Sequence, residues 1–123
     1  MNYHIITLDG EDIKFRLTSL HSIEIEKKTG VKLLDYIQDY SMTTIINLLM
    51  YMRRSEIANF CEKDAAALYD KLIDNAYTLE DVMFKIIYET AVVSGFLKKV
   101  DLEEVMANQE KLKSKKKQEL LEK

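Results

Sequence analysis

The side chains that could carry out chemistry are few and widely spaced in this sequence. It has two histidines, His4 and His21, and one cysteine, Cys61. A metal site needs three or four convergent ligands, and neither histidine has a second ligand at a spacing that would build one. His21 and Glu24 share one face of a predicted helix, which fits a surface or packing role. No nearby base would activate the Cys61 thiol, which we expect to lie half-buried at the start of a helix.

The acidic pairs and the glycines do not indicate catalysis either. The pairs Glu80–Asp81 and Glu103–Glu104 fall in predicted first turns of helices, where the helix dipole favours negative charge. The chain has three glycines, and all are isolated: Gly10, Gly30 and Gly95. Isolated glycines do not form a phosphate-binding loop. We therefore expect a protein that is not an enzyme and that binds no cofactor and no metal.

Two groups of residues could serve binding instead. Met50, Tyr51 and Met52 give one predicted helix a flexible, polarisable end of the kind that adaptable surfaces use, although filling the core is the simpler role. The second group is a run of lysines near the C-terminus: Lys111, Lys113, Lys115, Lys116 and Lys117. Such a run suits an acidic partner or nucleic acid, but it contains no arginine or aromatic residue that would read bases. A solvated tail is the default, a protein partner comes next, and nucleic acid is the least favoured.

An apolar stretch, Ser41 to Arg54, organises the other elements. Between Ile45 and Met52 only Asn47 interrupts the apolar residues, and a helix that is apolar nearly all round must be covered on several sides. Ser41 is a good N-cap. Because a bilayer crossing needs about 20 apolar residues, we expect a buried central helix and no membrane association.

The remaining elements are predicted from periodicity and turn residues. Strands over 3–8 and 13–17, joined through Asp9 and Gly10, indicate a β-hairpin, and Ile13, Phe15 and Leu17 should share its buried face. Helices are predicted over 20–28, 31–40, 62–75 and 79–99. Gly95 within the last helix indicates either a close helix crossing or an earlier helix end.

The predicted fold class is therefore α+β, mostly α. An N-terminal β-hairpin (3–17) packs on a compact bundle of about five helices (18–106), so that 1–106 forms a single globular domain. Residues 107–123 form a basic, helical or disordered tail. That tail has six lysines and three glutamates, a net charge of +3, which leaves −6 for residues 1–106 of a chain whose net charge is −3. An acidic domain thus carries a basic tail.

Composition sets the broad class of the protein. The chain has 123 residues, of which 47% are apolar and 32% charged, and it has no proline; these values are typical of a globular, helix-rich domain. A single cysteine cannot form an internal disulfide. The N-terminus lacks the pattern of a signal peptide, so we expect a cytoplasmic protein.

The order and spacing of these elements resembles a known family. The chain begins with a hairpin, followed by FRLTSLHSIEIEKKTGVKLLDYI, the serine-led apolar helix SMTTIINLLMYMRR, CEKDAAALYDKLIDN, and a long helix after TLEDV. This order is similar to that of the tail assembly chaperones of long-tailed bacteriophages and prophages. The likeness covers about residues 3–99, with a local core at EKKTGVKLL.

This resemblance implies a helper protein without enzymatic activity in the cytoplasm of the bacterial host. Such chaperones bind the long helical tape measure protein and recruit tail tube subunits around it. The family often also makes a longer product by ribosomal frameshifting, and the Ser114–Lys117 stretch could be encoded by an A-rich slippery sequence.

A chaperone of a helical client needs an exposed apolar groove with a charged rim. We expect one wall of such a groove, or of a self-association surface, to include Met50, Tyr51, Met52, Phe84 and Tyr88. The alternative is a structural phage component, such as a head–tail connector or minor tail protein. A third interpretation is a small nucleic-acid-binding regulator that uses the basic tail.

Overall fold

A computed structural model describes residues 2–100, 103–104 and 107. The N-terminal part is an antiparallel hairpin of β1 (His4–Leu8) and β2 (Glu11–Phe15). The helices between residues 19 and 93 follow in this order: α1 (Ser19–Thr29), α2 (Leu33–Ile37), α3 (Met42–Arg53), α4 (Glu62–Asp74), and a continuous helix of α5 (Leu79–Asp81), the π-helical η1 (Val82–Ile87) and α6 (Tyr88–Val93). The predicted α+β, mostly helical fold class is confirmed. The predicted tail, apart from Ala107, lies outside the described residues.

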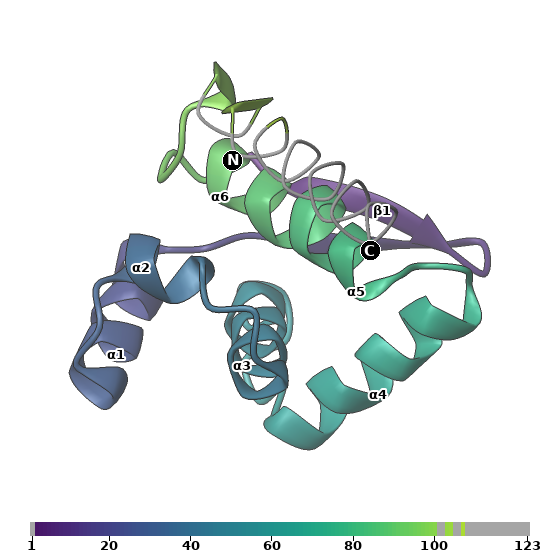
Figure 1. Ribbon diagram of the computed structural model, residues 1–123. Helices are drawn as coiled ribbons and strands as arrows, with labels where there is room; N and C mark the ends of the chain where they lie inside the picture. Colours follow the sequence, from purple (N-terminus) through teal and green to yellow (C-terminus); the bar gives the residue numbers. More distant parts are fainter. Residues whose placement is uncertain (1, 101–102, 105–106, 108–123) are drawn as a thin grey trace, which may run out of the picture.

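Helix α3 is the centre of the fold. It lies between α2 on one side and α4 on the other (Figure 1) and also contacts β2 and η1. Every residue from Thr44 to Met52 is buried except Asn47, whose amide lies 3.4 Å from the Tyr36 hydroxyl. The Ser41 hydroxyl accepts the Thr44 N–H at 3.3 Å and caps the helix as predicted. The apolar stretch therefore forms the buried central helix that its sequence indicates.

The hairpin turn follows the predicted chemistry. Asp9 and Gly10 have φ values of 51° and 81°, and positive φ at both central residues is the requirement of a two-residue type I′ turn. The register pairs Ile6 with Ile13, and these residues face the core together with Leu8 and Phe15. The alternation predicted for the second strand is confirmed.

Helix α1 has local caps but buries little surface, whereas α2 buries Leu33, Tyr36 and Ile37. The Thr18 hydroxyl accepts the His21 N–H, and Gly30 ends α1 with φ 73°. Ile25 is the one buried residue of α1. Helix α2 covers only part of the predicted 31–40 range, and the apolar residues Leu34 and Tyr40 within that range are exposed.

Helix α4 is capped by its own carboxylate. Asp64 accepts the Cys61 N–H at 3.1 Å and the thiol at 3.2 Å, and the backbone hydrogen bond is the main reason that the pKa of Asp64 is lowered. The apolar stripe of this helix is only partly buried: Ala65 and Leu72 are inside, whereas Ile73 is 40% exposed.

The last helix differs from the single α-helix predicted over 79–99. Thr78 and Asp81 cap its start by reciprocal hydrogen bonds. Residues 82–87 then form π-helix, and the Tyr88 N–H bonds to Met83 O, five residues back. Three pairs of buried residues lie four residues apart, Val82–Met83, Ile86–Ile87 and Thr90–Ala91, and Tyr88 is buried as well. In an α-helix of 3.6 residues per turn a four-residue repeat drifts by about 40° each time, so wider turns keep these pairs on one face.

This helix ends earlier than predicted. Gly95 has φ 88°, and no atom lies within 4 Å of where its Cβ would be, so the glycine belongs to a helix end and not to a close crossing. The Ser94 hydroxyl accepts the Leu17 N–H at 2.9 Å. This bond ties the end of α6 to the exit of the hairpin.

Candidate functional site

The predicted partner-binding residues of the central and last helices are mostly in the core. Met50 and Tyr51 are each 5% exposed, Met52 is 0% and Tyr88 is 1%. These four fill the core and do not line an open groove, which corrects our expectation. Phe84 is partly buried and stacks on Tyr88 with ring centroids 5.4 Å apart. The five predicted tail lysines, Lys111 to Lys117, lie outside the described residues.

The side chains singled out for chemistry lie on different elements: His4 on β1, His21 on α1 and Cys61 just before α4. Among the described residues, no group of three or more histidine, cysteine or acidic side chains could hold a metal ion. The His21 ring packs against Tyr51 at 5.7 Å, and burial lowers its pKa, partly opposed by Glu24. Cys61 is exposed and not half-buried as expected, because it precedes α4 at the surface.

Burial also affects Tyr88. Its hydroxyl is enclosed in the core beside Tyr40, and burial raises its pKa, with a further contribution from the Tyr40 hydroxyl. A phenol of this kind stays neutral at physiological pH, so it contributes no charge to a site.

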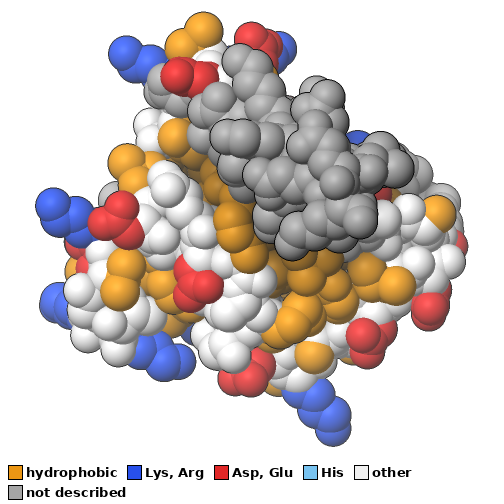
Figure 2. Space-filling view, in the orientation of Figure 1, with side chains coloured by type: hydrophobic (Ala, Val, Ile, Leu, Met, Phe, Trp, Pro, Cys, Tyr) orange, Lys and Arg blue, Asp and Glu red, His pale blue; other side chains and the backbone are white. Residues whose placement is uncertain are grey.

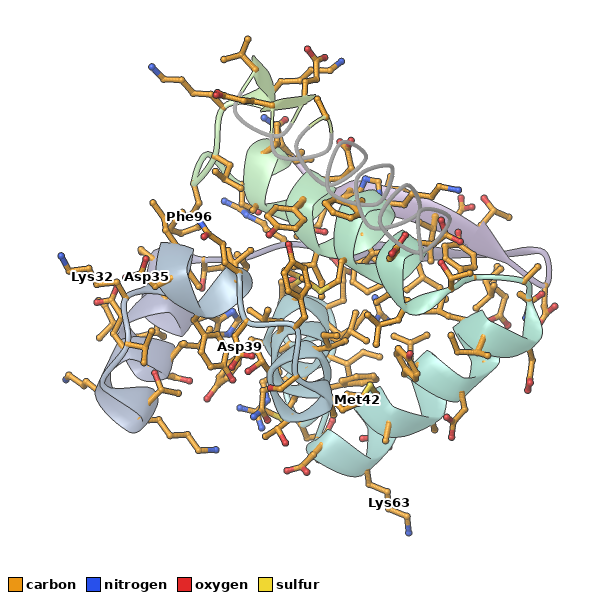
Figure 3. The ribbon with its side chains drawn as sticks, in the orientation of Figure 1. Lys32, Asp35, Asp39, Met42, Lys63 and Phe96 are labelled. Atoms are coloured by element: carbon orange, nitrogen blue, oxygen red, sulfur yellow. The ribbon has the colours of Figure 1, made fainter. Side chains whose placement is uncertain are left out.

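A groove lies beside α2. It has a volume of about 570 Å³ and is lined from α1, α2 and the chain after α6: Ser22, Glu26, Lys32, Leu33, Leu34, Asp35 and Phe96. Figure 3 shows Phe96 next to α2, beside Lys32 and Asp35. The floor is apolar, since Leu33 is buried and Phe96 is packed against the core, whereas both signs of charge stand around it.

Local structure fixes the shape of this groove. The N–H of Leu33 lies 3.4 Å from Glu26 Oε1, so α1 supplies the cap of α2 and holds the two helices together. Thr29 Oγ1 donates to the Ile25 carbonyl at 2.7 Å, and Gly30 then turns the chain. Leu34, one residue along from the buried Leu33, is left 45% exposed.

Helix α1 and the connection to α2 carry further apolar side chains that the core does not cover. Leu20 is 61% exposed, Ile23 is 47% and Val31 is 39%. Single exposed apolar residues are ordinary, but these three lie within twelve positions of each other and close in sequence to the groove residues. Since α1 packs chiefly against α2, this pair of helices offers apolar surface to a partner.

The sequence analysis missed this groove because it placed the binding surface on the central and last helices instead. A signal was present: Leu20 and Ile23 lie one turn apart, and Ile25 projects from another side of the same helix. A short helix with apolar residues on two sides cannot bury both against a single neighbour.

A second apolar area is visible on the face in Figure 2, between α3, α4 and α5, with acidic side chains along its lower edge. Met42, which Figure 3 labels at the start of α3, is 43% exposed. Leu68, Tyr69 and Phe84 are partly buried. Of the predicted binding residues within the described chain, Phe84 alone falls outside the buried core.

Comparison with known proteins gives no further assignment: no protein-family model matches the chain, and neither a curated protein nor a solved structure shows significant similarity to it. Among the described helices, none is both long enough and apolar enough to cross a membrane.

Proposed function

We propose that this protein is a phage tail assembly chaperone that acts in the cytoplasm of the bacterial host, binds the tape measure protein and helps to recruit tail tube subunits. The order of elements that resembles this family motivates the proposal. The observation that supports it best is the α1–α2 groove, an apolar depression with charged residues of both signs around it. An amphipathic client helix binds to such a surface by placing apolar side chains in the groove and charges at its rim.

The size of the groove matches part of a helix and not a whole client. Its volume of about 570 Å³ would take a few apolar side chains of a partner. A long helical client offers many such groups along its length, so several chaperone molecules could bind one tape measure protein. Each contact would then be weak enough to be released when the tail tube assembles.

The test is co-expression with the long helical protein encoded downstream, followed by a pull-down and a solubility assay. Leu34→Asp places a charge in the groove at a side chain that is 45% exposed in the free protein. Burying the rest of a leucine is worth about 1 kcal/mol, or about fivefold in affinity, and an unpaired buried charge adds a further penalty. We expect Leu34→Asp to weaken client binding at least tenfold.

The matched control is Ile73→Asp, because Ile73 is 40% exposed but lies on α4, away from the groove. It should leave client binding within about twofold of the parent protein. If the parent protein neither binds nor solubilises the client, the chaperone proposal is wrong, and a structural component that stays with purified phage particles takes its place. If both variants bind like the parent protein, the groove is not the client site.

A further inference from the structure

The two outer edges of the hairpin differ in whether their outward-pointing backbone groups are hydrogen-bonded. In a two-residue hairpin the pairs Leu8–Glu11, Ile6–Ile13 and His4–Phe15 exchange the ladder hydrogen bonds, so the backbone groups of Ile5 and Thr7 point outward from β1. Those of Lys14 and Arg16 point outward from β2.

The outer edge of β2 is closed by α3. The Arg16 N–H donates to the Met52 carbonyl at 3.1 Å, and Arg53 Nη1 donates to the Lys14 carbonyl at 2.7 Å. No further strand can pair there without displacing the end of the central helix.

Within the described part of the chain, no backbone group is bonded to the outer edge of β1. Within the described residues, neither Ile5 nor Thr7 has a backbone hydrogen bond on that side, and the Ile5 side chain is 50% exposed. The strand sequence, HIITL, contains no lysine, no other charged residue and no proline, which are the devices that usually protect an edge from pairing. It is therefore an edge that accepts another strand.

Charge along the hairpin favours an antiparallel copy of itself as that strand. Asp9, Glu11 and Asp12 lie at the turn. At the other end, Lys14 and Arg16 both stand over the Tyr3 ring, at 5.6 Å and 5.9 Å from its centre. An antiparallel partner brings the acidic turn of each hairpin next to the basic end of the other, whereas a parallel copy would place like charges together.

We propose that two copies of this chain pair through their β1 strands about a two-fold axis at Ile6, which makes a four-stranded antiparallel sheet. In this register Ile5 of one copy lies opposite Thr7 of the other, and His4 lies opposite Leu8. The two outward-facing residues of each strand then exchange four backbone hydrogen bonds. All five residues of β1 are matched with uncharged partners, and cross-strand pairs of β-branched residues are favourable.

This register also extends the buried face of the sheet. Ile6 is 9% exposed and Leu8 is 3%, and the axis places the two Ile6 side chains side by side. His4 Nε2 is buried without a hydrogen-bond partner on the same face. The interface is built from one short strand per copy, so it belongs to the small, weak class, and we expect a dissociation constant of about 10–100 µM.

The first test is sedimentation equilibrium of the full chain in a Cys61→Ser background. Ile5→Pro removes one outward N–H, and proline is tolerated on an edge strand where that group faces solvent. Circular dichroism and a urea melt should confirm that this variant folds. Ile5→Thr is the control, because it keeps the N–H and a β-branched side chain.

We expect Ile5→Pro to weaken dimerisation at least tenfold and Ile5→Thr by less than about threefold. A parent protein that stays monomeric up to about 1 mM, or a folded Ile5→Pro variant that dimerises like the parent, overturns the proposal.

The second test fixes the register. In the same background, Ile5→Cys and Thr7→Cys proteins are mixed and oxidised. The proposed register brings residue 5 of one copy opposite residue 7 of the other, so the mixed disulfide should form faster than either disulfide between identical variants. Faster cross-linking of Ile5→Cys with itself would mean an axis at Ile5 and would refute this register, and no cross-linking would refute strand pairing. Neither test depends on the client, so both can succeed or fail independently of the chaperone proposal.

Discussion

Replacing Leu48 by alanine tests whether α3 is the structural centre of the fold. Leu48 is 0% exposed on a helix that contacts α2, α4, β2 and η1, so the cavity would be walled by several elements that cannot all move in. Leu→Ala changes at such sites cost about 2–5 kcal/mol. We expect about 3 kcal/mol here, a large share of the roughly 5–15 kcal/mol that stabilises a domain. For a domain of about 100 residues this lowers the melting temperature by about 12–24 °C.

The assay is urea unfolding followed by circular dichroism at 222 nm, with a thermal melt as a second measurement. Met42→Ala is the control on the same helix, because Met42 is 43% exposed. It should change the free energy of unfolding by less than about 0.5 kcal/mol, as surface substitutions do. A loss of less than about 1 kcal/mol for Leu48→Ala, or equal losses for the two variants, would refute the placement of α3 at the centre of the core.

Three further predictions concern single side chains. Burial lowers the pKa of His21 from its ordinary value of 6.5, so the unfolded chain binds this proton more readily and the folded state loses stability as pH falls through 6.5. Between pH 7.5 and 5.5, urea melts should therefore show a smaller loss of unfolding free energy for His21→Gln than for the parent protein. An equal loss would contradict this reasoning. Ser41→Ala removes the acceptor of the Thr44 N–H and should cost about 1 kcal/mol, whereas Ser41→Asp should restore most of it in the same melt. Arg53→Met removes the hydrogen bond to the Lys14 carbonyl and should lower the free energy of unfolding by about 1.5–3 kcal/mol. Amide hydrogen exchange in β2 should become faster. Unchanged exchange there would show that this bond does not hold the hairpin to α3.

Where the sequence predicted structure correctly, local chemistry and tertiary packing required the same arrangement. The turn at Asp9–Gly10 needs two positive φ values, and this pair of residues accepts them. Ser41 and Thr78 supply side-chain caps at the positions where helices begin. The central helix was predictable because a stretch apolar nearly all round has no stable alternative to burial.

The structure differs from the sequence-based prediction where tertiary packing, and not local sequence, determines the conformation. The 82–87 segment reads as an ordinary amphipathic helix, and its sequence pattern does not distinguish the π-helix that forms there from an α-helix. Gly95 left two alternatives open, and the empty space around it together with its positive φ selects a helix end. Helix α4 presents a clear apolar stripe, yet one neighbouring helix covers only part of that stripe, so Ile73 stays at the surface.

The binding surface was the least predictable feature, and the reason lies in how a small core chooses among its apolar residues. The sequence contains more apolar helical surface than one core of this size uses, but pattern alone does not say which residues are left over. Met50, Tyr51 and Met52 belong to the helix with the most neighbours and are therefore buried. Leu20, Ile23 and Leu34 belong to helices with few neighbours and remain exposed. A search for partner-binding residues in such a protein should therefore start from the elements with the fewest packing partners and not from the most apolar ones.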